Sequence, residues 1–476
     1  MPPPTKSLVG KTTLSLCAVY GIYRYLKLDT HAVVQLIKFV LTAFVSKVTV
    51  PICRFLEKAL GSVPLRPSNP SNLTAQFVQW VLNNQGYSGS KVKSIFVKPF
   101  DAGKTSKTVR ISIEYDATQS KSVNPPSSLV CKMNREDIEG RVFNLVAGLY
   151  REASFYKSYA KSCGLEVPNV LYSYVDTWFS FDFVIIMEDL SPAKTIIEAD
   201  TLRPYFTEDK LDNSWSMDID LVESCINNLI PFHNKFASKN EEIADLPWVI
   251  NIYRNNYEKL NLFDFYFKTG WKKTKAQQAQ GEWLSTPWPN SYVAVVDEFV
   301  SNFKALVLDD EHLNFPRTLA HGDYHGMNIL KTQSNRLVVV DFQILTFAPG
   351  LFDVGYFLIG ALSPSERRKH DRRLVKLYYD GLKKLGNHLE DETTLPFELF
   401  YQRYLVGAFF KHVLLVINSA TIMADGKEED FYLVPWIHHR LKAFLEDHKD
   451  IIGIWRKSTA WRRRLLIESG RLQKSV

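Results

Sequence analysis

Two aspartates and an asparagine stand within residues 319–343, where their types and spacing suit phosphoryl-transfer chemistry. Asp323 is followed five positions later by Asn328, and Asp341 closes the apolar run 337–340. An acceptor hydroxyl must be oriented and must lose a proton, which a carboxylate accepts. Magnesium prefers hard oxygen ligands such as carboxylates and amide carbonyls. The spacing therefore predicts a proton acceptor and two magnesium ligands at one end of a hairpin.

Each of these three residues also has an ordinary explanation. Asp and Asn are common in turns, so no single one of them indicates a site. Residues 333–336 have the composition of a turn, which would place strands on both sides of it. The spacing and the apolar run before Asp341 together favour the chemical interpretation.

The motif resembles that of a known superfamily. Residues 321–330 read H-G-D-x-x-x-x-N-I-L, and D-F-Q follows at 341–343. This is similar to the aminoglycoside phosphotransferase and choline kinase superfamily. The D-F-Q, with E-D-L at 188–190, looks closest to the ecdysteroid-kinase-like branch. The resemblance implies an α+β, bilobal protein-kinase-like fold, and an enzyme that uses ATP and Mg²⁺ to phosphorylate a hydroxyl of a small molecule.

The resemblance also implies roles for individual residues. Asp323 would be the catalytic base, and Asn328 and Asp341 would hold the metal. His321 would brace the loop without taking part in the chemistry. Asp353, in the segment after D-F-Q, would brace the same loop.

Two residues further towards the N-terminus complete the set that such a kinase needs. Lys132 ends the apolar stretch 128–133, and Glu152 follows in an expected helix. A strand lysine held by a helix glutamate grips the α- and β-phosphates of the nucleotide in protein kinases. The competing interpretation is a lysine at an exposed strand end and a glutamate on a solvated helix face. The order of strand, helix and E-D-L favours the first.

The nucleotide base would meet residues Met187, Glu188 and Asp189, at the hinge that the resemblance implies. Backbone groups there would contact adenine, and the Met187 side chain would line its pocket. A glycine-rich phosphate loop is weak in this chain, because only Gly103 lies between the first two expected strands.

Hydrophobic patterning predicts the elements that must position these groups. Short stretches that alternate apolar and polar residues, or that are apolar throughout, predict strands. Longer stretches with apolar residues at helical spacing predict helices. The strands are expected at 91–98, 108–115, 128–133, 169–176 and 183–187, with helices at 73–82 and 142–161. From residue 190 onward the pattern is mostly helical, apart from 318–344. This order predicts a small lobe with an antiparallel sheet and a larger helical lobe.

The expected domains follow from that pattern and from a proline-rich linker before residue 73. Residues 1–65 are expected to form an apolar basic extension, and residues 66–190 a nucleotide-binding lobe. Residues 191–445 would form a lobe with the catalytic loop and the acceptor site, and residues 446–476 a basic C-terminal helix.

The chain of 476 residues has a net charge of +7 and five widely spaced cysteines, which favours an anionic ligand and a reducing compartment. No basic block indicates nucleic acid. For residues 1–65 three interpretations compete: helices packed on the main domain, a membrane-surface anchor, and a cleaved targeting peptide. Lys38 interrupts the apolar run 32–45, which disfavours a spanning helix. A cytoplasmic or peripherally membrane-associated protein is expected.

The acceptor is not named by the sequence. Trp271, Trp283 and Trp288 could pack on a sterol-like alcohol or cage a quaternary amine, but core packing is the more ordinary explanation. His233, on an apolar stretch, is expected to be a satisfied core histidine. The alternative function is a pseudokinase-like binding or scaffold protein at a membrane surface. A protein kinase is disfavoured, since the loop reads H-G-D and not H-R-D.

Overall fold

The structure is a computed structural model of the full chain. It describes most of the chain after residue 65, in the ranges 66–99, 106–116, 124–135, 148–176, 182–198, 215–237, 240–251, 257–280, 288–313, 315–385, 395–420 and 430–472, with single residues 41, 64, 144 and 202. The expected extension 1–65 and Gly103 therefore lie almost entirely outside the described residues.

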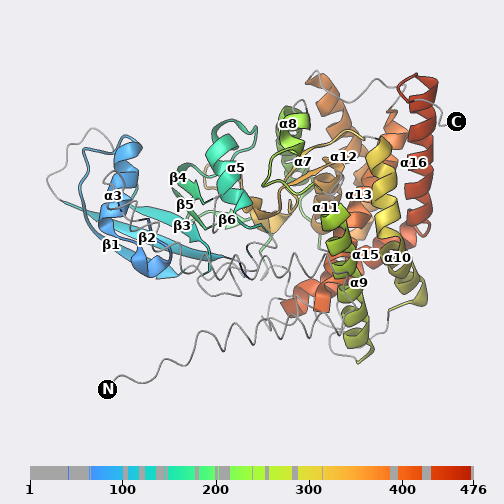
Figure 1. Ribbon diagram of the computed structural model, residues 1–476, viewed down its shortest axis with the longest axis horizontal. Helices are drawn as coiled ribbons and strands as arrows, with labels where there is room; N and C mark the ends of the chain where they lie inside the picture. Colours follow the sequence, from blue (N-terminus) through green and yellow to red (C-terminus); the bar gives the residue numbers. More distant parts are fainter. Residues whose placement is uncertain are drawn as a thin grey trace. The chain divides into compact units, whose positions relative to one another are not determined.

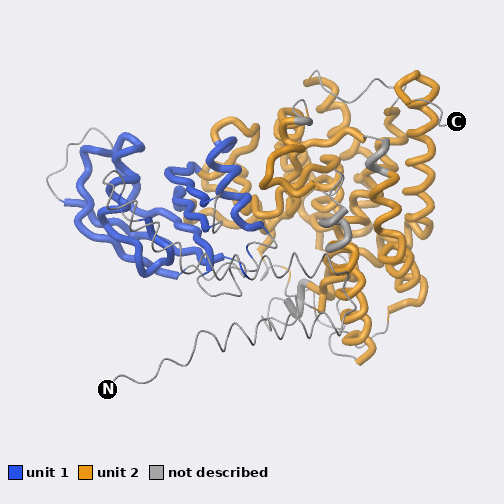
Figure 2. Tube along the Cα trace, viewed as in Figure 1, with its two compact units in different colours: residues 1–160, 169–189 blue, residues 161–168, 190–476 orange. Residues whose placement is uncertain are grey.

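The chain divides into two compact units (Figure 2). Unit 1 comprises residues 1–160 and 169–189, and unit 2 comprises residues 161–168 and 190–476. Each unit has its own core and is described by itself.

Unit 1 is built on a five-stranded antiparallel sheet in the order β1-β2-β3-β5-β4. The strands are β1 (Val92–Pro99), β2 (Lys107–Tyr115), β3 (Ser128–Met133), β4 (Val170–Val175) and β5 (Phe183–Glu188). β3 and β5 are apolar along most of their length because they lie inside the sheet. β1 is an edge strand in which no residue is fully buried, and Phe96 is exposed.

Among the described residues of unit 1, the helices α3 (Ala75–Asn84) and α5 (Arg151–Tyr159) accompany the sheet (Figure 1). In α3, Thr74 caps the first turn by accepting the N–H of Phe77 at 3.2 Å. Its apolar face joins the core formed by β2, β3 and β5. α5 is shorter than the helix expected over 142–161, because Gly148 has a φ of 69° and no right-handed helix continues through it.

Unit 2 is mostly helical. Its longer helices are α7 (Ile219–Ala237), α9 (Tyr257–Ala279), α10 (Asn290–Leu313), α11 (Leu351–Ala361), α12 (Pro364–Lys384), α13 (Phe397–Ile417), α15 (Asp430–Asp447) and α16 (Ile451–Glu468), with the short α8 (Asn240–Ala244). α13 packs against α9, α11, α12, α15 and α16, which explains why it is apolar on nearly every side. α10 and α16 lie side by side (Figure 1).

Short strands in unit 2 flank the loop of residues 321–328, which carries Asp323. β7 (Thr318–Ala320) pairs with β10 (Thr346–Ala348), and β6 (Lys194–Thr195), β8 (Ile329–Lys331) and β9 (Leu337–Val339) form a second small sheet. The expected turn at 333–336 joins β8 to β9, with Asn335 in the left-handed region at a φ of 61°.

The α+β class predicted from the sequence is confirmed, with an antiparallel sheet in unit 1 and a mostly helical unit 2. Within the ranges that the structure describes, no helix is both long and apolar enough to cross a membrane. The expected basic C-terminal helix is α16, where Trp455 and Arg462 are buried while Arg463 and Arg464 are exposed.

Candidate active site

The loop that follows β7 carries Asp323, and a glycine shapes it. Gly322 has a φ of 82°, a conformation that favours glycine. A Cβ at this position would collide with the carbonyl group of Ile344. The H-G-D motif therefore needs its glycine for two independent reasons, one in the torsion and one in the space available.

Asn328 is held against Asp323. Its amide nitrogen donates to the backbone oxygen of Asp323 at 3.0 Å and to the carboxylate Oδ2 at 3.2 Å. Both partners only accept hydrogen bonds, so the nitrogen must face them and the amide oxygen must face away. An amide oxygen turned away from the carboxylate is a suitable cation ligand.

Asp341 is brought to the same place by the β8–β9 hairpin. Ile329 pairs with Val339, and the N–H of Val340 donates to the backbone oxygen of Asn328 at 2.9 Å. Asp341 follows directly, with a left-handed φ of 67°. The structure therefore brings together the three residues that the motif predicted as base and metal ligands.

This donor set suits magnesium. Within the described ranges, no three His, Cys, Asp or Glu side chains are grouped to hold a metal ion. An amide and a carboxylate are nevertheless hard oxygen donors, and magnesium in kinases takes few protein ligands and completes its shell with water and phosphate oxygens. Asn328 and Asp341 are consistent with that pattern.

Asp353, in the first turn of α11, binds the backbone of the loop that carries Asp323. Its carboxylate accepts the backbone N–H of His321 at 2.6 Å and that of Gly322 at 2.9 Å. His233 Nε2 lies 3.1 Å from the same carboxylate, and its Nδ1 lies 2.8 Å from the Tyr378 hydroxyl. His233 is thus a fully bonded core histidine, as expected.

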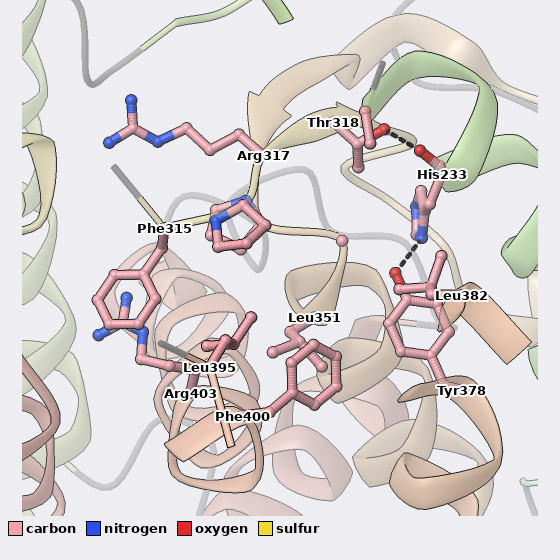
Figure 3. A pocket seen from close by; sticks show the side chains of 14 residues that line it. His233, Phe315, Arg317, Thr318, Leu351, Tyr378, Leu382, Leu395, Phe400 and Arg403 are labelled. Carbon is pink, nitrogen blue, oxygen red and sulfur yellow. Dashed lines mark hydrogen bonds between the residues drawn. The ribbon is translucent and has the colours of Figure 1, made fainter. Parts of the chain in front are cut away.

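Figure 3 shows the His233 and Tyr378 side chains joined in this way, with the Thr318 hydroxyl donating to the His233 backbone oxygen at 2.7 Å. They line a small cavity of about 40 Å³, enclosed mainly by apolar side chains such as Leu351 and Phe400. This space is large enough for water but too small for a ring, so it is a packing feature behind the loop.

His321 is a neutral structural histidine. Its Nδ1 accepts the N–H of Asp323 at 3.2 Å, so the proton must lie on Nε2, which donates to Val340 O at 3.0 Å. Burial lowers the pKa of His321, although nearby Asp353 acts in the opposite direction. The imidazole therefore links the Asp323 loop to the end of β9.

The electrostatic surroundings keep Asp323 ionised. Burial alone would raise the pKa of its carboxyl, but its contact with His325 and the nearby ammonium of Lys411 hold the pKa below its usual range. Burial alone would raise the pKa of Asp353, but hydrogen bonds from His233 and the Gly322 N–H, with the other groups around this carboxylate, together lower it. Two carboxylates close to the loop are thus kept charged by hydrogen bonds and positive neighbours.

Three residues of this site were not predicted. His325 Nε2 lies 3.5 Å from Asp323 Oδ2, while its Nδ1 accepts the N–H of Met327 at 3.2 Å. Burial and a hydrogen bond with Asp323 raise the pKa of Tyr356, so this phenol stays protonated. Lys411, from α13, donates to Gly322 O.

The sequence held a signal for each of them. His325 lies inside the motif, and Tyr356 is one helical turn after Asp353. Lys411 interrupts the apolar stretch 404–417 on a helix that packs on most sides, where a charge demands a partner.

An apolar pocket of about 110 Å³ adjoins this loop within unit 2. Its walls come from α9, α10, α11, α13 and the β7–β10 pair, and they include Phe267, Phe303, Phe352, Phe410, Gly322 and Lys411. The pocket therefore reaches the residue next to Asp323, on a side where Lys411 is the charged group.

Unit 1 holds the remaining predicted residues. Lys132 Nζ lies 2.6 Å from Glu152 Oε2, and the two side chains are only 9% and 1% exposed. The solvated-face interpretation is therefore wrong for this pair.

At the end of β5, Met187 is buried. The Glu188 side chain accepts the N–H of Asn169 at 2.8 Å, and Asp189 forms an ion pair with Arg110 at 2.7 Å. Both carboxylates already bind partners within unit 1. The groups expected to contact the adenine ring are therefore backbone groups.

The tryptophans considered for the acceptor are mainly structural where they are described. Trp271 is buried, donates to Asp297 at 2.7 Å and stacks on Trp288 with ring centroids 5.6 Å apart. Trp283 lies outside the described residues.

Residues 210–391 match the model of the ecdysteroid kinase-like family. The resemblance predicted from the motifs is confirmed over this segment. It includes Asp323, Asn328, Asp341 and Asp353, whereas Lys132 lies outside it. No curated protein sequence matches the chain.

Solved structures similar to the chain include three phosphotransferases. A choline kinase from Cryptosporidium parvum Iowa II is 14% identical, with 77% of this chain and 93% of that chain covered and a TM-score of 0.46. An ethanolamine kinase from Plasmodium vivax is 13% identical, covers 85% and 94%, and has a TM-score of 0.39. An aminoglycoside 2'-phosphotransferase-IIIa in complex with GDP is 11% identical, covers 80% and 99%, and has a TM-score of 0.44.

Proposed function

We propose that this protein is a kinase that uses ATP and Mg²⁺ to phosphorylate a hydroxyl group of a small molecule. The observation that supports this best is the grouping of Asp323, Asn328 and Asp341 at one end of the β8–β9 hairpin. The family match over residues 210–391 supports the same class of reaction.

In the proposed mechanism the protein chiefly positions the reacting groups and stabilises the charge on the transferred phosphoryl group. The Asp323 carboxylate orients the acceptor hydroxyl and receives its proton as the new P–O bond forms and the bond to the nucleotide's leaving oxygen breaks. The lowered pKa of Asp323 means that the carboxylate is ionised and able to accept a hydrogen bond from the acceptor hydroxyl. His325, Tyr356 and Asn328 hold this carboxylate in one orientation.

Asn328 and Asp341 would hold magnesium, which when bound neutralises charge on the phosphate oxygens. In unit 1, the ammonium of Lys132, fixed by Glu152, would bind the α- and β-phosphates. Backbone groups of 187–189 would meet adenine. His321 and Asp353 would support the loop without contacting substrate.

The test is magnesium-dependent ATP turnover by the full chain and by Asp323→Asn, across choline, ethanolamine, aminoglycosides and sterol-like alcohols. We expect one acceptor to stimulate turnover in the wild type, and a loss of about 10²-fold or more in the variant. Asp309→Asn, at an exposed position on α10, is the matched control and should behave as wild type. Equal turnover in Asp323→Asn and wild type would remove the assignment.

A further inference from the structure

Gly322 is held through both of its backbone polar groups by oppositely charged side chains. Its N–H donates to Asp353 Oδ1 at 2.9 Å, and its carbonyl accepts from Lys411 Nζ. Both bonds involve an ionised partner, which makes them stronger than bonds between neutral groups. Gly322 has no side chain that restricts its torsions. These two bonds therefore fix the backbone conformation immediately before Asp323.

Lys411 is the partner that comes from another part of the fold. It belongs to α13, 89 residues after Gly322. Lys411 lines the apolar pocket of about 110 Å³, and its Nζ lies 5.4 Å from the centroid of the Tyr356 ring. A lysine can bury its methylene groups in this way while its ammonium reaches a polar partner.

The titratable groups around Lys411 come from three elements. Of the charged groups, Asp323 lies on the loop and Asp353 on α11, while the neutral Tyr356 on α11 and His412 on α13 complete the surroundings. Burial lowers the pKa of Lys411, while Asp323 and Asp353 act in the opposite direction by attracting the ammonium. The proposed mechanism gives Asp323 a direct role but assigns none to the lysine beside it.

We propose that Lys411 is a positioning residue for the transfer reaction, which holds the Gly322 carbonyl and places a positive charge beside the Asp323 carboxylate. This inference rests on the proposed function. Lys411 acts through the loop and not through the nucleotide, so its loss should lower kcat and leave the KM for ATP nearly unchanged. A displacement of about 1 Å at a reacting group lowers the rate by about 10²-fold.

The experiment compares Lys411→Met, Lys411→Arg and Leu414→Met in the full chain, with ATP turnover as the first readout. Met keeps the length of the apolar stem and removes the charge. Leu414 lines the same pocket from the next turn of α13, so Leu414→Met changes packing alone.

We expect kcat to fall by about 10²-fold in Lys411→Met, with KM for ATP within about two-fold of wild type. Lys411→Arg should recover at least about ten-fold of that loss because it restores a cation, and Leu414→Met should be near wild type. A normal kcat in Lys411→Met, or an equal loss in Leu414→Met, would overturn the proposal.

Hydrogen exchange of the peptide covering residues 319–325 provides a second readout that does not need activity. Amides in this peptide should exchange faster in Lys411→Met than in wild type or Leu414→Met, since one bond to Gly322 is gone. If the wild type itself turns over no ATP, the proposed function fails, and identical exchange in wild type and Lys411→Met would overturn the positioning role separately.

Discussion

The Asp353 carboxylate accepts the backbone N–H of His321 at 2.6 Å, although 32 residues separate the two in the chain. The same carboxylate accepts the N–H of Gly322. The start of α11 therefore fixes the backbone of the loop that carries Asp323, and it does so with a buried charge. Several consequences of this arrangement can be measured.

Asp353→Asn should weaken the loop without changing its shape greatly. The amide presents an NH₂ group where the carboxylate accepts only, so one N–H of His321 or Gly322 loses its acceptor. An unsatisfied buried donor costs about 1–3 kcal/mol. We expect a lower free energy of unfolding in urea and a kcat reduced by about ten-fold or more. Asp297→Asn on α10 is the control, and equal kcat in both variants would argue against the brace.

Asn328→Ala should change the response to magnesium. The variant loses both the amide oxygen proposed as a metal ligand and the hydrogen bonds to Asp323. We expect the half-saturating Mg²⁺ concentration for turnover to rise by about ten-fold. Asn302→Ala, on α10, should leave it unchanged. A magnesium titration of turnover decides the matter, and superimposable curves for Asn328→Ala and wild type would exclude Asn328 as a ligand.

The Lys132–Glu152 pair should show a strong double-variant effect. The pair is buried, so Lys132→Met or Glu152→Gln alone leaves a charge without its partner, at about 3–5 kcal/mol. The double variant should be more stable than either single one, while both proteins that lack Lys132 should bind ATP weakly. Urea unfolding and nucleotide titration test the two parts. Additive losses of stability would contradict a direct pairing.

The stability of unit 2 should fall in mild acid because of buried histidines. Burial lowers the pKa values of His412 and His438 to about 3, well below the ordinary value of 6.5. The unfolded chain therefore takes up these protons first. The contribution of these histidines to the free energy of unfolding is fully present above pH 6.5. It falls as the pH drops from 6.5 towards 3, by about 1.4 kcal/mol per pH unit for each histidine.

His438→Gln isolates one of these contributions. The His438 ring lies between the Tyr292 hydroxyl at 3.0 Å and the Ser419 hydroxyl at 2.9 Å. Between pH 6.5 and 5, unfolding free energies should fall less steeply in the variant than in wild type. His370→Gln, at a more exposed position on α12, should keep the wild-type slope. Parallel slopes in His438→Gln and wild type would show that this histidine is not buried in its neutral form.

The sequence alone determined the local parts of this protein. Asp323 and Asn328 precede the β8–β9 hairpin and Asp341 follows it, so the hairpin's pairing already brought their segments together. The alternation of β2 and the apolar runs of β3 and β5 predicted the sheet because each strand's burial depends on its own residues.

Only the tertiary structure decided the contacts that come from elsewhere in the chain. Lys411 and Asp353 reach Gly322 because α13 packs against α11, and helix packing has no short-range code in the sequence. The apolar pocket beside the loop likewise depends on four helices and a strand pair meeting there. Long-range packing therefore added the groups that hold the Asp323 loop, while the sequence on either side of the hairpin supplied the groups proposed to do the chemistry.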